Sequence, residues 1–104
     1  MGYSSRMVKI LRIAEFDNWL DSLKDQLAKS SVQARIDRLA KGNAGDVKPV
    51  GEGVSEMRIH VGVGYWVYFT RVGTTIVLLL CGGDKSSQNR NIERALEMAR
   101  ILKE

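Results

Sequence analysis

The run from Ile76 to Cys81 is apolar at every position. A strand of this kind packs on both of its faces, because a strand in a half-exposed sheet alternates apolar and polar residues. We therefore expect a central strand with a layer on each side of its sheet. Gly82-Gly83 predicts a tight turn after it, and residues 84–88 are all polar. A helix predicted over Asn89–Lys103 follows, so the junction can offer backbone N–H groups and a lysine to an anion such as phosphate.

The size and composition are those of one folded domain. The chain has 104 residues, and we place a single domain over residues 1–104. A hydrophobic share of 44% and a charged share of 27% exclude a disordered chain. The 16 Lys and Arg against 12 Asp and Glu give a net charge of +4, which is compatible with RNA, DNA or an acidic protein partner.

Cysteine and histidine occur once each, and this limits the chemistry. Cys81 has no partner for an intrachain disulfide, and its place in the apolar run predicts a core thiol. Cys81 and His60 alone cannot build a His/Cys metal site, and we expect no metal and no cofactor. The sequence has no apolar stretch of signal-peptide or transmembrane length. These features favour a cytoplasmic protein with no membrane partner.

The first half of the chain predicts a strand and two helices. Met7–Ile13 alternates as a strand does, and Phe16, Trp19, Leu20, Leu23 and Leu27 then recur at helical spacing on one face. Ser30-Ser31-Val32-Gln33 has the form of a capping box, which predicts the start of a second helix that ends at Gly42-Asn43. The short connection predicts an antiparallel helix hairpin.

The second half predicts three strands before the last helix. Residues 43–53 are rich in Gly and Asn and contain the single proline, which predicts a loop with an extended piece around Val47–Val50. Val54–Val61, Tyr65–Arg71 and Thr75–Cys81 are predicted as strands, joined by short glycine turns and therefore antiparallel. The order β-α-α-β-β-β-α describes an α+β domain with a twisted, mainly antiparallel four-stranded sheet.

Strand periodicity gathers the polar and aromatic residues on one face. Glu56, Arg58 and His60 alternate with apolar neighbours, and Trp66, Tyr68 and Thr70 occupy the matching positions of the next strand. If the helix hairpin covers the apolar face, the other face is a shallow surface with Lys85 at its rim. Cations interleaved with aromatic rings suit single-stranded RNA, because cations bind phosphates and rings stack on bases.

Each of these residues also has a simpler interpretation. Glu56 and Arg58 could form an ion pair within the sheet, and His60 could make only a local hydrogen bond. Trp66 and Tyr68 could pack under the C-terminal helix. Lys85 could be a solvated side chain after a plain turn.

Three stretches resemble a known toxin family. They are the run Gly45-Asp46-Val47-Lys48-Pro49-Val50-Gly51-Glu52-Gly53-Val54-Ser55-Glu56-Met57-Arg58-Ile59-His60, the pair Gly64-Tyr65 with Val67-Tyr68-Phe69, and the run Leu79-Leu80-Cys81-Gly82-Gly83-Asp84-Lys85-Ser86-Ser87-Gln88. They resemble the RelE/ParE superfamily, in particular the HigB-like "addiction module killer proteins" of type II toxin–antitoxin modules. The resemblance extends over about residues 13–102. It implies a RelE-like fold, with a helix hairpin on one face of the sheet and a C-terminal helix.

The resemblance implies an mRNA endonuclease that works on the ribosome. The RNA 2′-OH attacks the phosphate in line, without metal or cofactor, while basic residues hold the phosphate. Carried over to this sequence, Arg58 and Lys85 are the catalytic cations. The expected substrate-binding residues are Arg58, Trp66, Lys85 and Lys48. From the shared face we add His60 and Tyr68 as groups for proton transfer or base stacking.

One departure bears on activity. Trp66 stands where the family usually has an arginine, and losing one such electrostatic donor lowers a rate on the order of 10²–10³-fold. We therefore expect an attenuated toxin. Two alternatives remain open: a ParE-like inhibitor of DNA gyrase, and a catalytically dead remnant that still binds its antitoxin. The implied partners are a helix-turn-helix antitoxin from the adjacent gene, the ribosome with its mRNA, and operator DNA through the antitoxin only.

Overall fold

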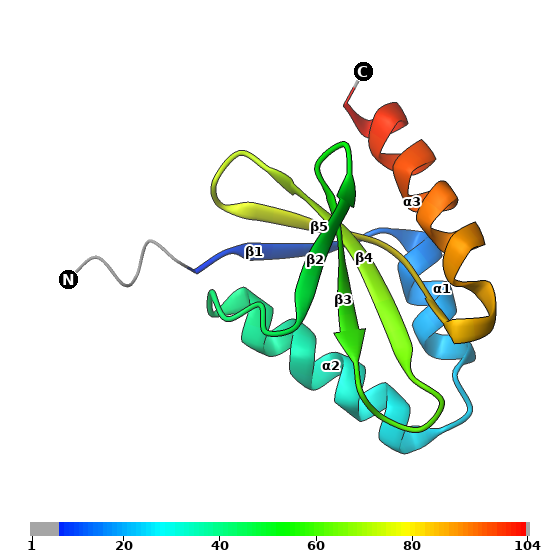
Figure 1. Ribbon diagram of the computed structural model, residues 1–104. Helices are drawn as coiled ribbons and strands as arrows, with labels where there is room; N and C mark the ends of the chain where they lie inside the picture. The colour runs from blue at the N-terminus through cyan, green and yellow to red at the C-terminus, as the bar shows by residue number, and fades with distance from the viewer. Residues whose placement is uncertain (1–6, 104) are drawn as a thin grey trace.

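Five strands form one sheet in the order β1-β5-β4-β3-β2 (Figure 1). The computed structural model describes residues 7–103, so residues 1–6 and 104 of the predicted domain lie outside the described part. The elements in chain order are β1 (Lys9–Arg12), α1 (Ala14–Ser22), α2 (Gln26–Ala40), β2 (Val47–Gly51), β3 (Val54–Ile59), β4 (Tyr65–Val72), β5 (Ile76–Asp84), the 3₁₀ turn η2 (Lys85–Ser87) and α3 (Gln88–Leu102). All neighbouring strands are antiparallel except β1 and β5, which are parallel. The α+β class is therefore confirmed.

The sheet has one strand more than the sequence predicts. Val47–Gly51, expected as an extended piece within a loop, pairs with β3 along most of its length. Its register shifts between Pro49 and Gly51, where Gly51 has a positive φ angle of 115°. Pro49 is tolerated because β2 lies at the edge of the sheet.

Strand β5 has the central position and the two-sided burial that its apolar run predicts. It lies between β1 and β4. Val77 and Leu79 belong to the core beneath α1 and α2, whereas Leu80 and Cys81 belong to the core beneath α3. Cys81 is buried, and burial raises the pKa of its thiol to about 12. The predicted role of Cys81 as a core residue is confirmed.

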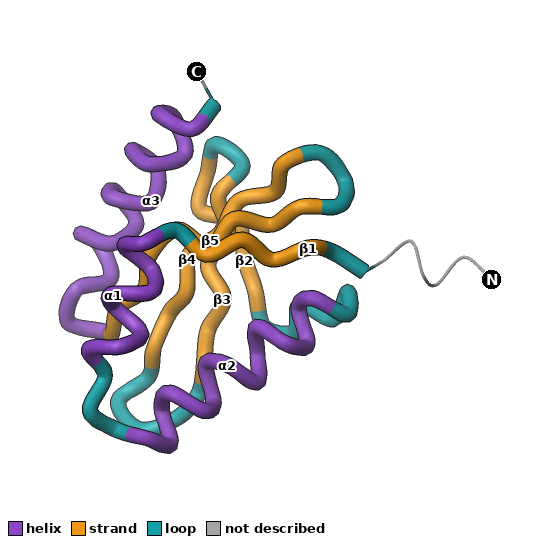
Figure 2. The backbone as a smooth tube through the Cα atoms, turned by 180° about the vertical axis from the view of Figure 1, so that it is seen from behind, coloured by secondary structure: helices purple, strands orange, loops and turns teal. Residues whose placement is uncertain are grey.

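Helices cover both faces of the sheet (Figures 1 and 2). One face carries α1 over β5 and α2 over β1 and β3, and the other carries α3 over β3, β4 and β5. Figure 2 shows α1 and α2 diverging in a V, not packed side by side as the expected antiparallel hairpin. Within residues 7–103, no helix combines the length and the apolar character needed to cross a bilayer.

The second helix begins four residues earlier than its predicted start. Asp25 caps it, because its carboxylate accepts hydrogen bonds from the N–H groups of Leu27 and Ala28. The hydroxyl of Ser30 instead donates to the carbonyl of Leu27 within the helix. Leu27 itself is 63% exposed, so its predicted inward position is wrong.

Gly82 and Gly83 lie inside β5 and do not form the predicted turn. They pair with Val67 and Trp66 of β4. A Cβ atom on Gly82 would clash with the ring of Trp19, so glycine is needed there because α1 packs directly on the strand. The polar turn therefore starts two residues later, with Asp84 capping η2 through a hydrogen bond from the N–H of Ser86.

Candidate nucleic-acid interface

Helix α3 covers the sheet face that was predicted to be open. Its buried residues Ala95 and Ala99 pack against Trp66 and Tyr68, which are 7% and 0% exposed. The predicted open aromatic surface is therefore wrong, and the simpler interpretation of both residues, that they pack under the C-terminal helix, is confirmed. The physical reason is that the apolar stripe of α3 needs a buried partner.

The predicted cations nevertheless meet at the rim of this face. Arg58, His60, Trp66, Lys85 and Gln88 line one surface hollow, which we call the cationic hollow. Arg58 and Trp66 are direct partners across β3 and β4, and Trp66 in turn pairs with Gly83, close to the point where η2 begins with Lys85. Sheet register thus places residues from three segments at one point. Arg58 and His60 stay exposed because they lie near the end of β3.

Arg58 keeps its positive charge available. Its guanidinium lies over the ring of Trp66, 5.5 Å from the centroid, which is a cation–π arrangement. The expected alternative, an ion pair with Glu56, is not formed. The carboxylate of Glu56 is 4% exposed and instead accepts a hydrogen bond of 3.3 Å from the Nε2 of Gln88. Among residues 7–103, Arg58 and Lys85 form no ion pair.

Lys48 lies beside the cationic hollow and not in it. Its ammonium is 3.8 Å from the Glu56 carboxylate, and the two residues line a neighbouring hollow with Asp46 and Arg58. Arg58 is the residue that the two hollows share. Of the predicted substrate-binding residues, Lys48 is therefore the one whose charge is partly neutralised within the protein.

A carboxylate holds His60 in place. The Oδ2 of Asp46 is 2.7 Å from the Nε2 of His60, so the local hydrogen bond considered for His60 is present. The bond from His60 is the main cause that lowers the pKa of Asp46 below its ordinary value. Arg35 anchors the preceding loop, because it donates to the carbonyls of Ala44 and Arg58. Sequence periodicity could not find Asp46, since the residue lies in the irregular segment before β2.

Tyr68 does not reach the hollow. Its side chain is completely buried, and its hydroxyl forms no hydrogen bond within the described part of the chain. Burial raises the pKa of Tyr68 above its ordinary value, and the neighbouring charge of Glu56 adds to this effect. A buried, protonated phenol under α3 has no direct access to a ligand, so the structure separates Tyr68 from the other predicted site residues.

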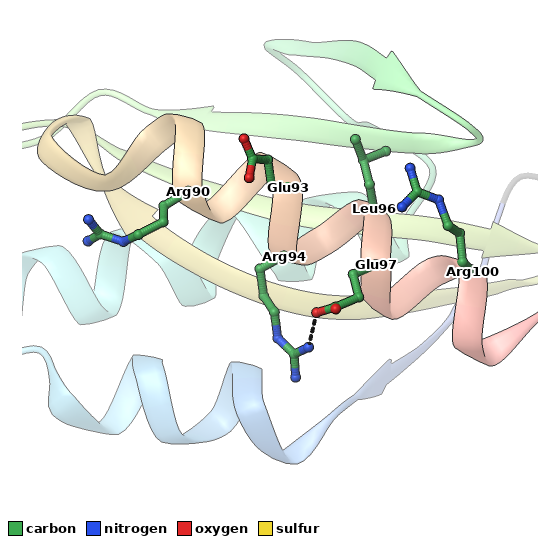
Figure 3. Close-up of a pocket in the computed structure, with 6 residues that line it drawn as sticks. All are labelled: Arg90, Glu93, Arg94, Leu96, Glu97 and Arg100. Carbon is green, nitrogen blue, oxygen red and sulfur yellow. Dashed lines mark hydrogen bonds and ion pairs between the residues drawn. The ribbon is translucent and has the colours of Figure 1, made fainter.

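The arginines on the outside of α3 differ from those at the rim. Figure 3 shows three of them beside two glutamates along the helix. Arg94 donates to Glu15 of α1 and to Glu97, and Arg100 donates to Glu52 in the β2–β3 turn. These ion pairs neutralise charge and fasten α3 to its neighbours. The cationic hollow therefore presents positive charge that the outer face of α3 largely lacks.

The side chains that usually bind metals do not cluster in the described residues 7–103. No group of three His, Cys, Asp or Glu residues suited to hold an ion occurs among residues 7–103. What the hollow offers is two cationic side chains, an oriented imidazole and an amide. Such a set can bind a phosphodiester and stabilise charge that develops on it.

The comparisons with known proteins place the chain beside one relative of similar length. No protein-family model and no solved structure matches it. It is 45% identical over 95 residues to a protein of Haemophilus influenzae named "Uncharacterized protein", and the match spans 91% of this chain and 96% of that protein. The chain therefore belongs to the same family as this Haemophilus influenzae protein.

Proposed function

We propose that the protein is the toxin of a type II toxin–antitoxin module, with a RelE-like version of the α+β fold and a weakened, metal-independent mRNA endonuclease activity on the ribosome. The main supporting observation is the cationic hollow, where Arg58 and His60 from the end of β3 meet Lys85 of η2 beside Trp66. The resemblance of the sequence to HigB-like toxins supports the same activity. Cytoplasmic location and an adjacent-gene antitoxin are parts of this proposal.

In the proposed reaction the scissile phosphate lies between Arg58 and Lys85. The 2′-oxygen of the RNA attacks the phosphorus in line, the bond to the 5′-oxygen breaks, and a 2′,3′-cyclic phosphate remains. His60, oriented by Asp46, accepts the proton of the 2′-hydroxyl, and water protonates the departing 5′-oxygen. The two cations stabilise the charge on the phosphorane. Tyr68 has no part in this scheme, because its hydroxyl is buried.

Trp66 explains why the activity should be weak. It occupies a wall of the cationic hollow, where an arginine would add a third cation next to the phosphate. The same observation favours the second candidate, a remnant that has lost cleavage and retains antitoxin binding. In that case the hollow binds RNA without cutting it.

Controlled expression separates these functions. We expect induction to arrest translation and primer extension to map new mRNA ends, with both effects lost in Lys85→Ala. The matched control is Lys9→Ala, which removes an exposed lysine of β1 that pairs with Ile76, at the end of β5 opposite to Lys85. Intact mRNA with a DNA-damage response would point to gyrase inhibition. Tight antitoxin binding with no growth effect would point to the remnant.

A further inference from the structure

The β3–β4 turn presents an exposed valine beside Lys85. Val63 is 67% exposed, and the glycines on either side of it have positive φ angles of 54° and 88°. Such angles suit glycine and are strained for other residues. The turn is thus built to project the Val63 side chain outward.

Val63 lines a second hollow, which we call the turn hollow, together with Asp84, Lys85 and Ser86. The pairing of Tyr65 with Asp84 brings the turn next to the end of β5. Figures 1 and 2 both place the β3–β4 turn at the same end of the sheet as the junction between β5 and α3. The turn hollow and the cationic hollow meet at Lys85, which lines both.

Asp84 offers one free acceptor in the turn hollow. Its Oδ1 accepts two hydrogen bonds from Ser86, from the N–H at 3.0 Å and from the hydroxyl at 2.6 Å. Its Oδ2 accepts none from residues 7–103. The Ser86 hydroxyl is the main cause that lowers the pKa of Asp84 below its ordinary value, so the group is a carboxylate at neutral pH.

These features select an uncharged ligand that has an apolar face and an amino group. A second phosphate would be repelled by Asp84, whereas an exposed valine can pack against the face of a base and remove apolar surface from water. The edges of unstacked bases are the usual elements of sequence recognition in single-stranded RNA. Adenine, cytosine and guanine carry an exocyclic amino group, and uracil carries none.

We infer that the turn hollow is a nucleobase subsite, in which the base next to the bound phosphate packs on Val63 and donates its amino group to Asp84. This inference rests on the proposed function, and it makes Asp84 a specificity-determining residue. Continuity with Arg58 and Lys85 favours a nucleotide over a protein as the ligand, since the phosphate and base of one nucleotide would fill both hollows.

The test measures binding and not cleavage. Isotope-labelled protein is titrated by NMR with four 2′-O-methyl trinucleotides that differ in one base and lack the attacking hydroxyl. We expect the adenine, cytosine and guanine forms to bind about tenfold more tightly than the uracil form, as for one hydrogen bond to a charged acceptor. The resonances of Val63 and Ser86 should shift on binding.

Asp84→Asn gives the decisive comparison. An asparagine oxygen can still accept from Ser86, while its amide becomes a donor where the carboxylate was an acceptor. We therefore expect the uracil form to bind more tightly than the adenine form, because uracil offers carbonyl acceptors to the new amide and adenine has no carbonyl. Asp21→Asn, the same change on an exposed position of α1, should leave the order of the four bases unaltered.

Several results would overturn the subsite. The first is equal binding of all four trinucleotides, or no detectable binding of any. The second is an unchanged order of base preference in Asp84→Asn. The third is a Val63→Ser variant that binds RNA as before but no longer binds a protein partner. Failure of the proposed function looks different. A protein that neither cleaves mRNA nor arrests growth, yet shows the base preference and its reversal, keeps the subsite and loses the toxin assignment.

Discussion

Trp66→Arg is the most informative single substitution, because stability and activity should move in opposite directions. Trp66 is 7% exposed. Burial of about 150–250 Å² of aromatic surface is worth about 4–6 kcal/mol at about 25 cal/mol per Å². An arginine recovers part of this, since its stem can follow the same apolar surface while its head reaches the hollow. We expect a net loss of about 2–3 kcal/mol, within the roughly 5–15 kcal/mol of a typical domain.

The same substitution should raise activity. Trp66 lines the cationic hollow beside Arg58 and Lys85, so a guanidinium there would add a third cation at the phosphate. One such electrostatic donor changes a rate on the order of 10²–10³-fold. Repulsion from Arg58 adds to the stability loss in the free protein, and a bound phosphate relieves it. Primer extension on cellular mRNA after induction at low temperature measures the gain, and circular dichroism checks the fold.

Two matched variants separate charge from packing. Trp66→Leu loses much of the aromatic packing and adds no charge, so its cleavage should not rise. Trp66→Lys adds the charge with a different geometry and should give a smaller gain than arginine. If folded Trp66→Arg cleaves no faster than Trp66→Leu, the hollow does not bind the scissile phosphate as proposed.

Two further predictions concern the fold. Gly82→Ala should lower the free energy of unfolding by about 1–3 kcal/mol, as for an overpacked core, because its Cβ would clash with the Trp19 ring. Urea unfolding measures this change. An equal loss from Gly82→Ala in a Trp19→Leu background would contradict the steric cause. The hydrogen bond from Arg94 lowers the pKa of Glu15 below its ordinary value of 4.5, so this group adds stability above that pH and loses it as pH falls through the lower folded pKa. Glu15→Gln should therefore lower the urea midpoint modestly at pH 7 and hardly at all near pH 2.5, while Glu93→Gln should lower neither.

Strand positions could be predicted where one local pattern decides them. The apolar run of β5 requires cover on both faces, and the alternation in β3 assigns Arg58 and His60 to the same side without any tertiary information. Strand β2 could not be recognised in this way. Its residues Val47–Gly51 include a proline and a glycine, and pairing with β3, which is not visible locally, makes the segment a strand.

The site was harder to predict than the sheet, because exposure depends on where a helix packs. Periodicity places Trp66 and Tyr68 on the face of Arg58, but the course of α3 decides that these two are buried while Arg58 stays exposed. A central strand that is apolar on both sides already requires a layer over that face, so an open aromatic surface and the β5 pattern were incompatible. At the rim of this face, polar residues stay exposed at the end of β3, on the edge strand β2 and at the start of α3. For this reason Arg58, His60 and Lys85 meet at the rim, and a ligand that they bind must lie along the edge of the helix layer.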